Sequence, residues 1–262
     1  MVAASKMRKA QQAALDARPF ARLVYRIQRS VVTRAGDVSH PLLAVRGLRK
    51  RAVILIAADK GLCGALNTNV FKLAAQFDPE TTTYITAGRR AAQFVARSRR
   101  QLAAEFAYGD SPNFGEARAI ARVAREMFVS GEVDEVQLVA TRFVNTLTQD
   151  AMTLPFLPIG ELKTLEMPGV GLDTPHADDS EILFEPSTEG VLAFLLERYL
   201  NIYLYLVLLN AKASEQSARM VSMKNATDSA ETLIKDLTLE YNKLRQGNIT
   251  KELLEIAGGQ AD

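Results

Sequence analysis

The feature that most constrains this chain is an apolar repeat in its last third. In alternating steps of three and four residues, sixteen positions from Leu192 to Leu244 are apolar except Gln216 and Thr227. A sustained repeat of 3.5 residues is typical of a left-handed coiled coil. Since no proline follows Pro186, nothing in the sequence forces a break. The repeat predicts one helix over residues 188–257, roughly 100 Å long at 1.5 Å per residue.

A second apolar seam lies in the N-terminal segment. Positions 3, 7, 10, 14, 17, 21, 24, 28 and 31 are apolar except Gln28. Most are alanine, which lets a partner helix come close, and Pro19 predicts a kink. A helix as long as 188–257 cannot be buried in a globule of 262 residues. An antiparallel two-helix coiled coil made from both chain ends would cover both seams.

The middle of the chain alternates between strand-like and helix-like segments. We expect strands at Ala52–Ala58, Thr82–Thr86, Val136–Val144, Ala151–Leu157 and Ile182–Glu185, and helices at Leu66–Phe77, Arg89–Arg100 and Glu116–Phe128. This alternation predicts a Rossmann-like, mostly parallel α/β sheet with right-handed crossovers. The predicted fold class is therefore α/β, with an N-terminal coiled-coil helix at 1–48, an α/β domain at 49–186 and a long C-terminal coiled-coil helix at 187–262.

The residue types that carry chemistry are sparse. The turn Asp59–Asn67 has only a G-x-x-G spacing, and neither nucleotide-binding glycine motif occurs in the sequence, so we interpret it as a tight turn. One cysteine, Cys63, and two distant histidines, His40 and His176, cannot build a disulfide framework or a zinc site. Lys60 can lower the pKa of Cys63, although a structural thiol is favoured. We expect no catalytic residue, no cofactor and no metal.

The charge distribution points to an acidic partner. The net charge is only +2, but residues 1–36 contain eight basic side chains and one acid, Asp16. This basic start is also similar to an organelle transit peptide, but the same residues carry the apolar seam. The arginines of 89–100 lack accompanying aromatic residues, which favours a solvated helix face over a nucleic-acid patch. The apolar run Val191–Leu209 contains Glu197 and Arg198, so we interpret it as a buried or partner-facing helix.

Six segments carry a family resemblance. Residues Ala213–Asp228 (ASEQSARMVSMKNATD) resemble the ASEQxARMxxMxxAT signature of F-type ATP synthase gamma subunits. Further segments similar to that family, in order along the whole chain, are Met1–Gln11, Arg18–Phe20, Asp59–Asn67, Leu239–Gln246 and Ile249–Ile256. The family normally has several helical turns before the segment that starts here at Met1. We expect a misassigned translation start rather than a shortened protein.

The resemblance implies a central rotor shaft that couples rotation of a membrane ring to conformational cycling of a catalytic hexamer. The implied partners are the alpha and beta subunits of that hexamer, the epsilon subunit and the membrane c-ring, with one copy of this chain per complex. The implied location is peripheral, on the cytoplasmic side of the bacterial inner membrane, and the subunit itself is non-catalytic. Positions matching hexamer-contacting residues of the family are Lys6, Arg8, Lys9, Arg219, Arg245, Gln246 and Thr250.

Two other interpretations remain open from the residues alone. A non-catalytic coiled-coil scaffold would explain the seam but not the motifs. A dinucleotide-binding enzyme would need a glycine fingerprint after Ala52–Ala58, and this fingerprint is missing. The basic residues of the shaft can also be plain solvated flanks of a coiled coil.

Overall fold

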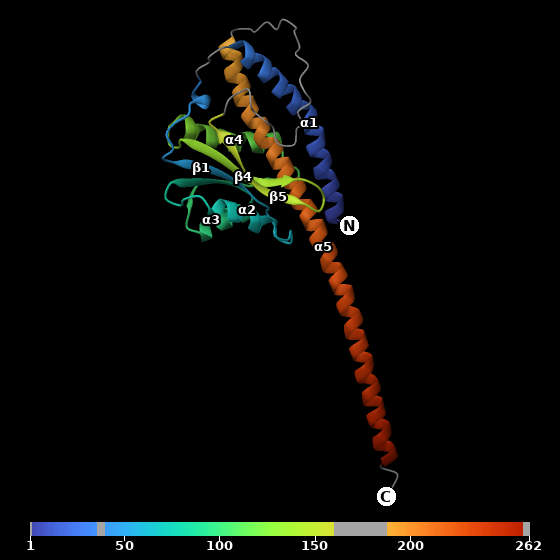
Figure 1. Cartoon of the computed structure of the whole chain (residues 1–262). Coiled ribbons are helices and arrows are strands. Elements are labelled where there is room, and N and C mark those ends of the chain that lie inside the picture. Colours follow the sequence, from blue (N-terminus) through green and yellow to red (C-terminus); the bar gives the residue numbers. More distant parts are fainter. Residues whose placement is uncertain (1, 36–39, 160–187, 259–262) are drawn as a thin grey trace. The chain divides into compact units, whose positions relative to one another are not determined.

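The computed structural model describes residues 2–35, 40–159 and 188–258 (Figure 1). Contacts divide the chain into two compact units, Met1–Met220 and Val221–Asp262. The boundary falls inside helix α5 (Thr188–Gly258), and we describe each unit by itself. The strand predicted at Ile182–Glu185 lies outside the described residues, as does His176.

A five-stranded sheet forms the centre of the first unit. Its strands are β1 (Arg51–Ile56), β2 (Thr82–Ala87), β3 (Gln101–Phe106), β4 (Glu135–Phe143) and β5 (Gln149–Leu157), in the order β3-β2-β1-β4-β5. All neighbouring pairs are parallel except β4 and β5, which are antiparallel. The predicted mostly parallel α/β fold is confirmed.

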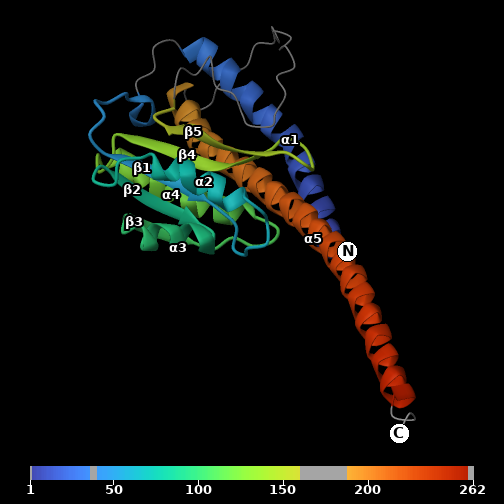
Figure 2. The ribbon, with the colours of Figure 1, turned by 60° about the horizontal axis from the view of Figure 1, so that its bottom comes forward.

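Helices cover both faces of this sheet (Figure 2). Side chains alternate along β1, so Val53 and Leu55 pack beneath α2 (Leu66–Ala75) and α3 (Arg89–Arg97). On the opposite face, Ile54 and Ile56 join a core cluster with α4 (Phe114–Val129) and the first part of α5. A short 3₁₀ helix, η1 (Pro41–Leu43), contributes Leu42 to that cluster.

Strand β3 was not expected from the sequence. It is an edge strand whose residues are exposed or only partly buried, so it lacks the apolar alternation by which strands are recognised. Helix α3 was also expected to reach Arg100, but it ends at Arg97. The Ser98 hydroxyl donates to the Phe94 carbonyl at 2.7 Å, and Arg99 adopts a left-handed backbone with φ 52°.

Helices α1 (Val2–Ala35) and α5 lie side by side and antiparallel in the first unit (Figures 1 and 2). Lys6 and Lys212 share the carboxylate of Asp110, while the ring of Phe20 meets the guanidinium of Arg198. Phe20 lies fourteen residues after Lys6, and Arg198 lies fourteen residues before Lys212, so the two helices run in opposite directions. The predicted antiparallel pairing of the N-terminal helix with the C-terminal helix is confirmed for the first part of α5. The prediction that it covers the whole seam is wrong, because the described residues from Lys224 onward are exposed.

Burial of α1 follows the predicted seam where side chains are described. Ala10 is 7% exposed, and the seam positions 3, 7, 14 and 17 are partly buried. The intervening Lys6, Arg8 and Lys9 are exposed. The helix continues through Pro19.

Within the first unit, α5 is buried on all sides. Nearly every residue from Leu195 to Ala218 is buried, whether or not it belongs to the seam. The sheet and α4 cover one side of the helix, and α1 lies along another. An apolar seam describes contact with one partner helix, so the sequence pattern predicts less burial than the structure shows. Among the described residues, no helix is both long and apolar enough to span a bilayer.

The second unit contains the remainder of α5. Every described residue from Lys224 to Ile256 is exposed. The seam positions Ile234, Leu237, Tyr241 and Leu244 are 63%, 54%, 63% and 62% exposed. The apolar repeat therefore continues into a part of α5 whose apolar side chains are exposed in this chain.

Candidate functional site

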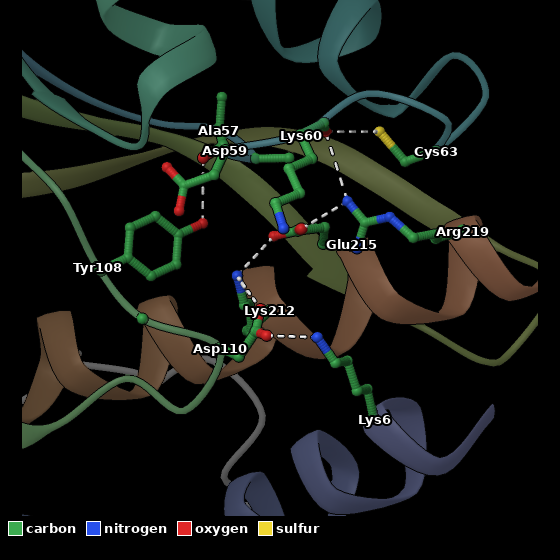
Figure 3. A network of polar contacts seen from close by, with 12 residues as sticks. Lys6, Ala57, Asp59, Lys60, Cys63, Tyr108, Asp110, Lys212, Glu215 and Arg219 are labelled. Atoms are coloured by element: carbon green, nitrogen blue, oxygen red, sulfur yellow. Dashed lines mark hydrogen bonds and ion pairs between the residues drawn. The ribbon is translucent and has the colours of Figure 1, made fainter. Parts of the chain in front are cut away.

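A chain of alternating charges joins α1, α5 and the loop after β3 (Figure 3). Lys6 Nζ lies 2.6 Å from Asp110 Oδ2, and Lys212 Nζ lies 3.5 Å from Asp110 Oδ1. Lys212 also pairs with Glu215 Oε2 at 3.0 Å, and Glu215 Oε1 accepts from Arg219 Nη2 at 2.7 Å. We call these five residues the ion-pair network.

The centre of the network is removed from water. The side chains of Lys212 and Glu215 are 1% and 3% exposed. Buried charges of this kind persist only when they are paired and hydrogen-bonded. Tyr108 adds a neutral wall, since its ring centroid lies 4.9 Å from Lys212 Nζ and its hydroxyl donates to the Ala57 carbonyl at 3.1 Å. Burial raises the pKa of Tyr108 well above its usual value, so this phenol stays protonated.

Hydrogen bonds between its own residues hold the glycine-rich turn after β1 in place. Leu62 and Gly64 take left-handed conformations with φ 63° and 59°. The Asn67 side chain accepts from the Ala58 N–H at 3.1 Å and donates to the Cys63 sulfur at 3.4 Å. These bonds account for a tight turn before α2, which agrees with the interpretation from the spacing.

Arg219 occupies the place where this type of sheet usually binds a ligand. Its Nη2 donates to the carbonyls of Lys60 and Gly61 at 3.4 and 3.5 Å. The strand order reverses at β1, and ligands of doubly wound sheets bind beyond the carboxyl ends of the strands at such a reversal. Here the loop presents carbonyl oxygens to a guanidinium belonging to the same chain.

Cys63 is a buried thiol within this turn. Burial raises its pKa, and the negative charge of Glu215 adds to the rise while Arg219 opposes it. The expectation that Lys60 lowers this pKa is therefore wrong, because desolvation dominates. The structural-thiol interpretation fits this burial.

No metal site is built by the part of the chain that the structure describes, since no three potential ligands of the His, Cys, Asp or Glu type converge there. His40 accepts from the Leu42 N–H at 3.2 Å and so caps the 3₁₀ helix. It is partly buried, and burial lowers its pKa.

The predicted site residues divide into two groups. Lys6 and Arg219 belong to the ion-pair network, and the Arg219 side chain is only 16% exposed. Arg8 and Lys9 are exposed on α1. Arg245, Gln246 and Thr250, in the second unit, are exposed as well, and the Thr250 hydroxyl donates to the Gln246 carbonyl at 2.9 Å. Their contact with a hexamer stays a prediction.

Sequence reasoning missed three members of the network. The sequence does contain a signal for Lys212 and Glu215. Just after a long apolar run, Glu215 and Arg219 follow Lys212 at three and seven positions, which puts all three charges on one face of a helix. Such charges are paired when the surrounding helix is buried. Asp110 had no local signal, because it lies in a loop and meets Lys212 only through the fold.

These observations first define a class of protein, in which helices from both chain ends pair and pack against a Rossmann-like domain. The family model described as ATP synthase matches residues 1–261. The chain belongs to the ATP synthase gamma chain family.

Curated relatives match over nearly the whole chain. The ATP synthase gamma chain of Opitutus terrae is 44% identical over 265 residues, covering 99% of this chain and 90% of the relative. That of Dehalococcoides mccartyi is 39% identical over 267 residues, covering 100% and 90%.

Solved structures share the fold. The central stalk and c-ring structure of the Tetrahymena thermophila mitochondrial ATP synthase includes a chain with a TM-score of 0.63 and 23% identity, covering 87% of this chain and 96% of that one. A rotor structure of the Euglena gracilis mitochondrial ATP synthase gives a TM-score of 0.53 at 17% identity, covering 95% and 98%.

Proposed function

We propose that this chain is the central rotor shaft of a proton-translocating F-type ATP synthase. It couples rotation of the membrane ring to conformational cycling of the alpha/beta catalytic hexamer, and it carries no active site of its own. Its membership of the gamma chain family over essentially its whole length supports this function. The similar solved structures are those of a central stalk with its c-ring and of a rotor.

The observation that carries the proposal is the uncovered seam of the second unit. Large apolar side chains at Ile234, Leu237, Tyr241 and Leu244 are each more than half exposed. Contiguous exposed apolar surface marks a site of interaction. Apolar contact is non-directional, so the inner surface of a hexamer can cover this helix while the helix turns inside it.

The exposed charges suit contacts that must be released in every turn. We propose that Arg8 and Lys9 face acidic segments of beta subunits, and that Arg245, Gln246 and Thr250 touch loops of the hexamer. An exposed ion pair contributes about 0–1 kcal/mol, so each contact is easily broken. Lys6 and Arg219 already hold partners within the chain, which favours an internal role for both beside any hexamer contact.

Catalysis in such a complex is a problem of linked conformations. An asymmetric shaft stabilises one conformation of each beta subunit at each angle, so three sites pass through different affinities in turn. We propose that the α/β domain and the base of the shaft contact the c-ring and the epsilon subunit. This places the chain peripherally on the cytoplasmic side of a bacterial inner membrane.

The test uses the assembled complex in inverted membrane vesicles. Arg245→Ala combined with Gln246→Ala is expected to lower ATP synthesis severalfold while this chain stays folded, because both side chains are exposed. A matched control is Lys72→Ala on α2 with Gln76→Ala at the C-cap of that helix; both side chains are exposed, and the change also removes one cation and one amide.

Two different results would refute the hexamer contacts of Arg245 and Gln246 and the rotor function of the whole chain. Wild-type synthesis rates in the Arg245/Gln246 variant would refute the hexamer contacts at these positions. Purification of a tagged chain without alpha, beta and epsilon subunits would refute the rotor function, and a coiled-coil scaffold would then be the better account.

A further inference from the structure

We infer that the ion-pair network is a torsional latch, which fixes the rotational angle of α5 relative to the α/β domain and α1. This inference rests on the proposed rotor function. In a rotor, torque must pass between the long helix and the domain packed on it. The residues that set their angle are then positioning residues for coupling.

The packing around α5 changes where the network begins. From Leu195 to Leu209 the helix buries large side chains, which interlock with their neighbours and define its orientation. Further along, the buried long side chains are the polar Lys212, Glu215 and Gln216, and the other buried residues are small, at Ala211, Ala213, Ser214, Ser217 and Ala218. Small side chains allow a close approach but interlock little, so apolar packing alone defines the helix angle poorly in this stretch.

The network supplies directional contacts in that same stretch. Lys212 reaches Asp110 in the loop after β3, and Arg219 reaches the carbonyls of Lys60 and Gly61 in the loop after β1. Lys212 and Arg219 are seven positions apart, so they project from one face of the helix two turns apart. A different loop of the α/β domain therefore holds each of these two turns.

Glu215 connects the two attachment points. It lies between them on the same face, and its two oxygens accept from Lys212 and Arg219 separately. Rotation of α5 about its axis would carry Lys212, Glu215 and Arg219 together, so it would break the contact of Lys212 with Asp110 and those of Arg219 with the loop carbonyls. The buried Lys212 would then lose its partner on the domain, which is unfavourable. The latch therefore resists rotation in both directions.

Lys6 extends the latch to the second helix. Its ammonium shares the Asp110 carboxylate with Lys212, so α1, α5 and the α/β domain meet at one side chain (Figure 3). Lys6 and Asp110 are about half exposed, with 46% and 57% of their side-chain surfaces accessible. This link is weaker than a buried one, so the main part of the latch is the attachment of Lys212 and Arg219 to the two loops, with Glu215 orienting both side chains.

A positioning role predicts that stability and coupling respond differently to substitution. Replacing a buried ion pair by apolar side chains of similar volume is often neutral or stabilising, while the directional constraint disappears. Lys212→Met combined with Glu215→Met removes both buried charges together. The matched control is Arg142→Met with Asp150→Met, which removes an exposed ion pair outside the network.

The experiment measures protons pumped per ATP hydrolysed by the complete complex in vesicles, together with the thermal unfolding temperature. We expect the Lys212/Glu215 variant to unfold within a few degrees of wild type and to hydrolyse ATP. Its pumping ratio should fall at least about fivefold, the lower end of coupling between linked sites. The Arg142/Asp150 variant should keep the wild-type ratio.

Asp110→Asn provides a second test at an exposed position that tolerates substitution. It removes the negative charge between Lys6 and Lys212, and the pumping ratio should fall by less than in the double variant. An unchanged ratio in this variant overturns the latch even where the double variant does not assemble. Wild-type ratios in both variants overturn it as well, whereas a wild-type complex without any ATP-driven pumping overturns the rotor function instead.

Discussion

Among the glycines that the structure describes, Gly88 leaves the least space for a side chain. It follows β2 with φ +97°, and a Cβ added there would lie 2.0 Å from the Ala57 carbonyl oxygen and 3.2 Å from Tyr108 Cε1. Neither neighbour can move freely. The Gly88 N–H donates to the Phe106 carbonyl at 2.9 Å, and the Ala57 N–H donates to the Ala87 carbonyl at 3.0 Å. The substitution Gly88→Ala must therefore separate the ends of three strands.

The expected loss of stability follows from three contributions. A non-glycine residue held at a positive φ costs about 1–3 kcal/mol. Overpacking a closed site costs about 1–3 kcal/mol, and loss of the Tyr108 hydrogen bond to Ala57 adds about 1 kcal/mol. We expect Gly88→Ala to lower the free energy of unfolding by roughly 3–7 kcal/mol, a large part of the ~5–15 kcal/mol typical of a folded protein.

Urea denaturation of the full chain measures this change. The sequence has no tryptophan and seven tyrosines. Because Tyr84, Tyr108, Tyr199 and Tyr203 are buried in the first unit, tyrosine fluorescence reports mainly on the packing of that unit, and far-UV circular dichroism reports on the helices. Gly47→Ala is the matched control, because nothing lies within 4 Å of its added Cβ, and we expect a change within about 0.5 kcal/mol. A Gly88→Ala protein within about 1 kcal/mol of wild type would refute the claimed backbone approach.

Two further predictions concern titration. Glu215 raises the pKa of Cys63 and Arg219 lowers it. Glu215→Gln should therefore lower this pKa and speed alkylation of the thiol in the native chain, whereas Arg219→Gln should raise the pKa and slow alkylation. Faster alkylation in both variants would contradict this and would show only that the turn around Cys63 has become more accessible. The hydrogen bond from Lys6 holds the pKa of Asp110 below 3.8, its ordinary value, so the stability it adds is complete above that value and is lost as the pH falls through the lower folded pKa. The difference in unfolding free energy between wild type and Lys6→Met, measured from pH 6 to pH 2.5, should therefore shrink in acid, and a pH-independent difference would contradict this linkage.

Strong periodic signals carried most of the fold prediction. The repeat placed the long helix at 188–257, and α5 spans Thr188–Gly258. The apolar run around Ile54 identified β1 because a central strand is buried on both faces. Strand β3 gave no such signal, since an edge strand needs few apolar residues. The burial of α5 on every side was also missed, because a seam describes contact with one partner helix only.

The site was harder to predict, because its residues meet only in the folded chain. Arg219 was identified from the family resemblance as facing another subunit, yet its described contacts are with Glu215 and the loop carbonyls of Lys60 and Gly61. Asp110 lies about one hundred positions before Lys212 in the sequence, and no local pattern relates the two. The pKa of Cys63 was predicted from a neighbouring charge, but burial decided its direction.

The turn after β1 has a consequence for inhibition. A fold that elsewhere opens its crevice to nucleotides has that opening closed here by an arginine from its own long helix. A small molecule that entered this space would have to displace Arg219 and break one of the two attachments of α5 to the loops of the domain. Such a compound would inhibit by separating α5 from the loop after β1, without competing with nucleotide at any catalytic site.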